Sequence, residues 1–241
     1  MGGYIDLHLH YVPQVDDGVK SVEDSLRLCQ GLASIGYVRL VTTPHIRSGM
    51  FENRKPGLVS AFEALKQEFA SVAGLPALDL SAEHHCDGLF MDLFLAGELL
   101  PYPGGRALLI EFANEMLPVS FDRIVFKLGL KGLRPILAHP ERYVPLFNST
   151  RPIQAFIAQE MGLQLDVMAL IGRYGRSPQR AAERMLEEGV YTVAASDAHH
   201  SDDVPLVADA IKALITIVGQ DEADILLRDN PERLLAGKAT L

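Results

Sequence analysis

Short apolar runs alternate with amphipathic segments from one end of the chain to the other. The apolar runs predict seven β-strands, near residues 4–8, 37–43, 78–82, 107–112, 134–138, 163–167 and 190–195. The segments between them carry helix signals: Ser21 with Asp24 resembles a capping box, and Gly36 follows the end of that helical pattern. Ser177 followed by Pro178 opens another helical segment. Strands that alternate with helices are typical of βα units and a parallel sheet.

Seven strands in this rhythm predict an α/β fold, a distorted (β/α)7 barrel that is one strand short of the regular TIM barrel. An open doubly wound sheet is the alternative, but such sheets usually place a glycine-rich phosphate loop after the first strand, and the sequence has none there. No linker, low-complexity tract or internal repeat interrupts the pattern. We therefore expect one domain over residues 1–241, a usual length for a barrel.

The charge balance limits the classes of partner. The chain has 31 acidic and 22 basic residues, for a formal net charge of -9 at pH 7, whereas nucleic-acid binders usually carry a basic stripe. No apolar run approaches the roughly 18 residues of a membrane span, and no basic region followed by an apolar core marks a secretory signal. Two cysteines, Cys29 and Cys86, are too few for a disulfide framework. We expect a cytoplasmic protein that neither binds nucleic acid nor inserts into a membrane.

The histidines are distributed unevenly. They form five groups, each at the carboxyl end of a predicted strand: His8 and His10, His45, His84 and His85, His139, and His199 and His200. Parallel barrels build their active sites at this end of the strands. Side chains at i and i+2 of a strand project to one face, so the first two histidines should lie side by side, and neutral imidazole is the commonest metal ligand.

Carboxylates occur at the same strand ends, namely Asp17, Glu83, Glu111 and Asp197. Glu111 lies in the apolar stretch ALLIEFA, where a carboxylate is costly unless it is paired or bound to metal. Asp17, between Asp16 and Gly18, also fits an ordinary turn. Imidazole and carboxylate together favour zinc, manganese or iron over calcium or magnesium. The sequence therefore predicts a metal site, and several converging strand ends favour more than one ion.

The motifs that carry these residues follow a recognisable order. The chain opens with the DxHxH pattern of Asp6, His8 and His10 and continues with VDDG, TPH, GMFEN, AE, IEF, AHPERY, IGRYG, ASDAH and DNPERLL. The opening resembles the PHP (polymerase and histidinol phosphatase) superfamily of metal-dependent phosphoesterases. The whole series resembles the bacterial manganese-dependent tyrosine-protein phosphatases of capsule and exopolysaccharide biosynthesis. The resemblance implies the same distorted, TIM-like (β/α)7 barrel.

The resemblance also implies three divalent metal ions, with Mn²⁺ expected and Fe or Zn as alternatives. It assigns one ion to His8, His10, Glu83 and Asp197, a second to Glu83, Glu111 and His139, and a third to Asp17, His45 and His199. Glu83 would then bridge two ions. Between close cations the pKa of a water falls towards neutrality, so that a hydroxide can attack phosphorus in line.

Arginines are expected to complete a phosphate pocket, because a planar guanidinium binds phosphate through two hydrogen bonds. Arg47 and Arg142 match phosphate-binding positions of the family, and Arg173 in IGRYG is a third candidate; a plain surface arginine is the alternative for each. Arg47, Arg142, Asp197 and His199 form the expected catalytic group.

The chain departs from the family pattern at one place. Family members commonly have another arginine shortly after the last DxH motif, whereas this chain has Asp202, Asp203 and Val204 there. Two acids and an aliphatic residue should weaken anion binding at that rim. The predicted metal ligands are unaffected.

The function implied by the resemblance is that of a phosphoric monoester hydrolase. Its substrate would be phosphotyrosine in a protein, in the family setting the tyrosine-rich C-terminal tail of a kinase of polysaccharide assembly. A small-molecule phosphatase of the histidinol-phosphate type is the alternative. A cysteine-dependent mechanism is excluded, because it needs an arginine six positions after the nucleophile, where Ile35 follows Cys29 and Asp92 follows Cys86. A nucleic-acid enzyme fits the charge poorly, and a silent binder would be expected to lack some of the ligands.

Overall fold

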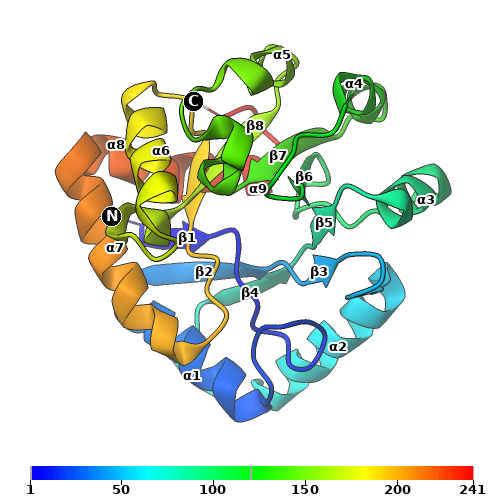
Figure 1. The fold of residues 1–241 in the computed structure, drawn as a ribbon. Coiled ribbons are helices and arrows are strands. Elements are labelled where there is room, and N and C mark those ends of the chain that lie inside the picture. The colour runs from blue at the N-terminus through cyan, green and yellow to red at the C-terminus, as the bar shows by residue number, and fades with distance from the viewer. Residues whose placement is uncertain (1, 120, 241) are drawn as a thin grey trace.

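The structure, a computed structural model, describes residues 2–119 and 121–240 (Figure 1). Its strands are β1 (Tyr4–Asp6), β2 (Tyr37–Thr42), β3 (His45–Ile46), β4 (Ala77–Leu80), β5 (Glu83–His85), β6 (Ala107–Glu111), β7 (Arg134–Ala138), β8 (Gly162–Asp166) and β9 (Val193–Ala195). Its α-helices are α1 (Val22–Ser34), α2 (Lys55–Glu68), α3 (Gly88–Ala96), α4 (Phe121–Leu130), α5 (Gln154–Ile157), α6 (Arg176–Glu187), α7 (Val204–Val218), α8 (Gln220–Asp224) and α9 (Asn230–Leu235).

The strands are parallel and form a closed ring. They pair in the orders β1-β2-β4 and β3-β5-β6-β7-β8-β9, and two hydrogen bonds, Ser81 N to Thr42 O (2.9 Å) and Glu83 N to Pro44 O (3.1 Å), continue the ladder across the breaks. β2 with β3, and β4 with β5, are thus two bent strands, which makes seven strand positions. A parallel bridge between Leu9 and Ala198 joins the first position to the last. The predicted α/β fold is confirmed, and this strand pairing agrees with the predicted distorted (β/α)7 barrel.

Alternation along the strands separates the barrel interior from the face under the helices. In β6, Ala107 and Leu109 pack in the inner cluster with Ile136 of β7, whereas Leu108 and Ile110 pack in the larger cluster that includes side chains of α3 and α4. Figure 1 shows the helices on the outside of the strands. Because Glu111 is two residues beyond Leu109, its side chain emerges at the carboxyl end of the interior.

The predicted helix signals are correct in one case and displaced in another. The Ser21 side chain accepts the backbone N–H of Asp24 (3.1 Å), as predicted for α1. The predicted start of α6, with Ser177 as the cap, is wrong by two residues. Arg176 already has helical geometry, and Gly175 precedes it as the cap, with φ of 96°. A positive φ favours glycine, so the local signal was the glycine rather than the serine.

Other predicted bounds hold within a few residues. The strand expected at 190–195 begins only at Val193.

Among the described residues, no helix is long and apolar enough to cross a membrane.

A turn below β6 offers a test of packing against α9. Gly104 and Gly105 both have positive φ, but a Cβ at Gly104 would lie 2.6 Å from the Leu235 carbonyl oxygen, whereas one at Gly105 would meet nothing within 4 Å. Gly105→Ala should cost about 1–2 kcal/mol from backbone strain alone. Gly104→Ala should cost about 2–4 kcal/mol, since backbone overlap adds to the strain. Urea denaturation of the two variants measures this, and equal losses would contradict the packing described here.

Candidate metal centre

The nine predicted metal ligands lie together at one end of the barrel. They come from every strand position, or the loop after it, except that of β8. They form three groups, and within each group the ligand atoms all lie within 4.8 Å of one another. The groups are His8, His10, Glu83 and Asp197; His45, Glu83 and Glu111; and His10, Asp17, His45 and His199. His139 lies beside them, with Nε2 3.0 Å from Glu83 Oε1. The first and last strands pair where the barrel closes. This pairing brings His8 and His10 next to Asp197 and His199.

The first group matches the set expected for the first ion and is buried. His8 Nε2 lies 3.0 Å from Glu83 Oε2 and 3.1 Å from Asp197 Oδ1. His10 Nε2 lies 3.3 Å from the same Asp197 oxygen. None of the four side chains is more than 5% exposed, so the two carboxylates need compensating positive charge.

The second group differs in part from the expected set. Glu83 and Glu111 are together, but the imidazole beside both is His45, whose Nδ1 lies 3.0 Å from Glu83 Oε2 and 3.6 Å from Glu111 Oε1. His139 Nε2 lies beside the other oxygen of Glu83, at 3.0 Å. Glu83 therefore has imidazoles of three different strand positions at 3.0 Å, those of His8, His45 and His139.

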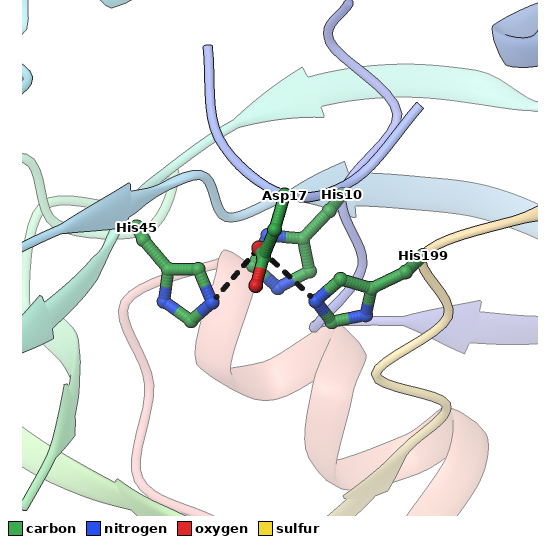
Figure 2. Close-up of side chains that lie close together, drawn as sticks. All are labelled: His10, Asp17, His45 and His199. Carbon is green, nitrogen blue, oxygen red and sulfur yellow. Dashed lines mark ion pairs between the residues drawn. The ribbon is translucent and has the colours of Figure 1, made fainter. Parts of the chain in front are cut away.

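The third group is the least buried of the three. Figure 2 shows its four side chains, with Asp17 between His45 and His199. Asp17 Oδ1 lies 3.4 Å from His45 Nε2 and 3.5 Å from His199 Nε2, as expected from the resemblance. His10 joins them, and its ring stacks on that of His199 with the centroids 4.1 Å apart. The side chain of Asp17 is 55% exposed, so this group faces solvent.

Buried atoms without a hydrogen bond show that the residues present fit divalent cations. His10 Nε2, His45 Nδ1 and Asp197 Oδ1 are buried and face other ligand atoms, yet none of them makes a hydrogen bond within the described residues. Buried polar atoms in proteins are nearly always paired, and these three point into the ligand groups. Imidazole nitrogens with carboxylate oxygens are the donors that zinc, manganese and iron prefer.

Outer residues hold the imidazoles so that the correct nitrogen faces the centre. His8 Nδ1 lies 2.7 Å from Gln164 Oε1, and His10 Nδ1 lies 2.6 Å from Asp16 Oδ2. Both oxygens only accept, so each Nδ1 carries the hydrogen and each Nε2 offers its lone pair to the centre. His199 Nδ1 donates in the same way to the Asp197 carbonyl oxygen (2.8 Å).

Sequence reasoning missed two of these partners. Asp16 fits a turn by sequence, but in the structure it is buried, accepts the N–H groups of Gly18 (3.0 Å) and His45 (3.1 Å), and orients His10. Gln164 could have been found from the sequence. Like Glu111, it is a polar residue within a buried, mainly apolar strand, GLQLD, and such a residue usually has a specific partner.

The electrostatics of the centre are dominated by its carboxylates. Burial alone would raise the pKa of Glu83, but the nearby His8 and His45 lower it well below its usual value. Burial alone would lower the pKa of His45, but Glu83 raises it to about 10. Burial alone would also lower the pKa of His199, but Asp17 raises it to about 9. In the absence of cations, protons therefore compensate the carboxylates, and metal ions must displace them.

Backbone strain is found at two of the ligands. His139 has φ of 37° and Asp197 has φ of 52°, in the left-handed region that residues other than glycine rarely adopt. Such strain persists only where the surrounding structure imposes it, and it is often found at functional sites.

The arginines expected to bind phosphate lie in different settings. The Arg142 guanidinium contacts Asp166 and Asp197, the latter at 2.5 Å, and lies 3.8 Å above the Tyr174 ring. Arg47 follows β3 and is half-buried, and its guanidinium has no hydrogen bond or ion pair with the described residues. Arg173 is half exposed and lies 3.4 Å from Asp203. Arg142 alone touches a predicted metal ligand.

The acidic segment after the last DxH motif has a structural role. Asp203 Oδ2 accepts the N–H groups of His199 and His200, both at 3.0 Å, and so fixes the loop that carries His199. Val204 packs against α1, since a Cβ placed at Gly31 would lie 2.8 Å from its Cγ2. At position 204 the side chain is therefore directed to the core and not to the rim.

The structure also gives roles to His84, His85 and Cys29, which lie outside the predicted ligand set. His85 Nδ1 lies 3.2 Å from Glu111 Oε1 and can orient it. His84 instead joins backbone groups, with Nδ1 donating to Leu109 O (3.0 Å) and Nε2 accepting from Leu100 N (3.2 Å). Cys29 is fully buried, and burial raises its pKa to about 12, so its thiol is no nucleophile.

Comparison with known proteins assigns the chain to a family. A family model described as "Capsular polysaccharide synthesis, CpsB/CapC" matches residues 4–236. The chain belongs to this family. It is similar to the tyrosine-protein phosphatase CpsB of Streptococcus pneumoniae, with 27% identity over 239 residues that cover 96% of this chain and 98% of that protein. It is also similar to the tyrosine-protein phosphatase YwqE of Bacillus subtilis, with 26% identity over 81% of this chain and 77% of that protein.

Solved structures share the fold. A structure from the work on YwqE of B. subtilis and CpsB of S. pneumoniae, described as metal-dependent tyrosine phosphatases, superposes with a TM-score of 0.88 at 23% identity, covering 98% of this chain and 96% of that one. Histidinol phosphate phosphatase from Lactococcus lactis, solved with zinc, has a TM-score of 0.56 at 12% identity, covering 91% and 95%. These structures support the barrel described above.

The loop after β1 packs closely against His10 at Gly18, so a substitution of this glycine tests the geometry of the metal centre. A Cβ there would lie 2.4 Å from the His10 carbonyl oxygen, so Gly18→Ala should displace Asp16 and Asp17 from His10. We expect metal affinity to fall about 10- to 100-fold, as for other losses of outer support. Gly57→Ala is the matched control, because nothing lies within 4 Å of that position. Elemental analysis after dialysis measures it, and equal metal retention in both variants would contradict the argument.

His84 should make the fold sensitive to acid. Burial lowers its pKa from 6.5 to about 4. The unfolded chain takes up this proton near pH 6.5 and the folded chain only near pH 4, so stability is lost as the pH falls through that window, by up to about 3 kcal/mol. In His84→Gln the decline of unfolding free energy between pH 6.5 and 4, measured by denaturation of metal-free protein, should be smaller by that amount. An unchanged decline would show that this histidine is not neutral when folded.

Proposed function

We propose that the protein is a metal-dependent phosphoric monoester hydrolase that removes phosphate from phosphotyrosine in proteins. The observation that carries the proposal is the convergence of nine predicted ligands, with unpaired buried atoms among them, in a chain of the CpsB/CapC family. Relatives of similar length are named tyrosine-protein phosphatases, which supports the substrate class.

The proposed cofactors are three divalent ions, Mn²⁺ first, with Fe or Zn as alternatives. The proposed ligands are His8, His10, Asp17, His45, Glu83, Glu111, His139, Asp197 and His199. When bound, such ions supply Lewis acidity and lower the pKa of water for attack on phosphorus. The chain itself contributes the orientation of the imidazoles by Gln164 and Asp16 and a buried, charged setting.

Among the arginines, Arg142 is the first candidate to hold the phosphate. Asp166 and Asp197 fix one of its nitrogens, and Tyr174 supports the face of the guanidinium, so its position is set before substrate binds. Arg47, after His45 on β3, is proposed as a second phosphate contact and Arg173 as a third. His199 and Asp197 complete the proposed catalytic group.

The biological setting is also a proposal. The family name supports a role in capsule or exopolysaccharide synthesis, and the substrate we propose is the tyrosine-rich C-terminal tail of a kinase of that process. Action on such a tail would place the protein in the cytoplasm, as one catalytic domain over residues 1–241. A histidinol-phosphate phosphatase is the second candidate, supported by fold alone.

Activity should depend on the first ligand group. We expect His8→Ala/His10→Ala to lose metal and at least a hundredfold in kcat/KM on a phosphotyrosine peptide with Mn²⁺, because two of four ligands of a buried group are removed. His200→Ala is the matched control, since this histidine belongs to none of the three groups. Elemental analysis and phosphate release measure both effects. Turnover of histidinol phosphate alone would favour the second candidate, and no metal with no turnover would refute both.

A further inference from the structure

A groove of about 510 Å³ lies beside the metal centre. Its lining includes Asn114, Arg142, Val144, Phe147, Tyr174 and Arg176, from the loops after β6, β7 and β8 and from the start of α6. Its volume is in the range of ordinary ligand sites. The metal centre, as proposed above, uses only Arg142 of this set.

The inner end of the groove reaches the metal centre. Arg142 is part of the groove wall, and its guanidinium is 2.5 Å from Asp197 Oδ2, a predicted metal ligand. Tyr174, stacked under Arg142 at 3.8 Å, is also part of the wall. A phosphate held at the centre by Arg142 would therefore leave the rest of its substrate next to this groove.

The groove lining includes apolar side chains that solvent reaches. Val144 is 53% exposed, and the half-buried Phe147 lies in the same lining. Exposed apolar side chains next to a polar centre suit contact with the side chains of a bound polypeptide rather than with a small polar molecule.

The groove lining also carries a positive charge without a partner. Arg176 is exposed, and among the described residues no carboxylate pairs with it. Its neighbours differ in this respect: Arg173 contacts Asp203 at 3.4 Å, and Arg184 contacts Glu188 at 2.6 Å. In a chain of net charge -9, a free arginine in the lining of a groove attracts an anionic group of a ligand.

A second depression near the centre lacks this property. It has a volume of about 350 Å³ and includes Lys20, Asp24 and Arg27 in its lining. Arg27 pairs with Asp24, and Lys20 donates to the Asp16 carbonyl oxygen at 2.9 Å. Its cations already have partners, so charge favours the groove at Arg176 as the path of a substrate chain.

We propose that this groove binds the polypeptide that flanks the phosphotyrosine, and that Arg176 selects substrates with an acidic side chain at one flanking position. The inference rests on the proposed function, because it assumes that phosphotyrosine occupies the metal centre. It adds a substrate preference that a site for small phosphate esters would lack.

The test uses phosphotyrosine peptides on a neutral background, each with a single Glu at one position from three residues before to three residues after the phosphotyrosine. With the Mn²⁺-loaded protein, we expect one position to raise kcat/KM about three- to fivefold over the neutral peptide, the size of an exposed ion pair. Arg176→Glu should reverse the preference through KM. It should leave turnover of p-nitrophenyl phosphate unchanged, because that substrate has no acidic side chain to pair with Arg176.

Arg180→Glu is the matched control, because it makes the same charge change one turn later on α6, at an exposed residue outside the lining. It should keep the preference. Equal effects of both variants, or no preferred position in the unmodified protein despite phosphotyrosine turnover, would overturn the groove and leave the proposed function intact.

If no phosphate ester is hydrolysed, the proposed function fails, and the groove is judged by binding alone. Fluorescence anisotropy of the same peptides then decides: tighter binding of one Glu peptide that Arg176→Glu abolishes supports the groove. Equal binding of all the peptides by the unmodified protein and by Arg176→Glu overturns it.

Discussion

The buried carboxylate of Glu83 is the constraint on which the rest of the centre depends. It is fully inaccessible and lies within about 3 Å of imidazoles on His8, His45 and His139, which come from three different strand positions. An isolated carboxylate would be too costly to bury there. The barrel can therefore hold this residue only together with several imidazoles and the positive charge they share with it, whether that charge is carried by protons or by cations.

The same requirement explains the shell around the centre. His8, His10 and His199 must each present one chosen nitrogen, so the other nitrogen needs a fixed acceptor. Gln164, Asp16 and the Asp197 carbonyl provide these acceptors. Arg142 then balances the outer oxygen of Asp197. Orientation, charge and burial are thus solved by the same few contacts, which leaves little freedom to change one residue without disturbing the others.

Much of this arrangement could be predicted from the sequence, for a physical reason. Strand alternation and strand ends are local properties, so the seven strand positions and the histidines beyond them could be located from periodicity, and the buried Glu111 was conspicuous in an apolar strand. The partners of the ligands were harder. Whether Asp16 serves a turn or an imidazole depends on a contact across the barrel mouth, and the placement of His45 rather than His139 beside Glu111 depends on the bend between β2 and β3. Val204 faces α1 because of helix packing, which no local pattern encodes.

The bridge between Leu9 and Ala198 has a consequence for biosynthesis. Asp197 and His199 leave the ribosome about 190 residues after His8 and His10, with which they are grouped. No local segment of the chain can form the first ligand group before the barrel closes. Contacts of such sequence separation form late, because their loop-closure entropy must be offset by the rest of the fold. A nascent or truncated chain therefore cannot assemble this ligand set, and acquisition of the metal reports that synthesis has passed the last strand.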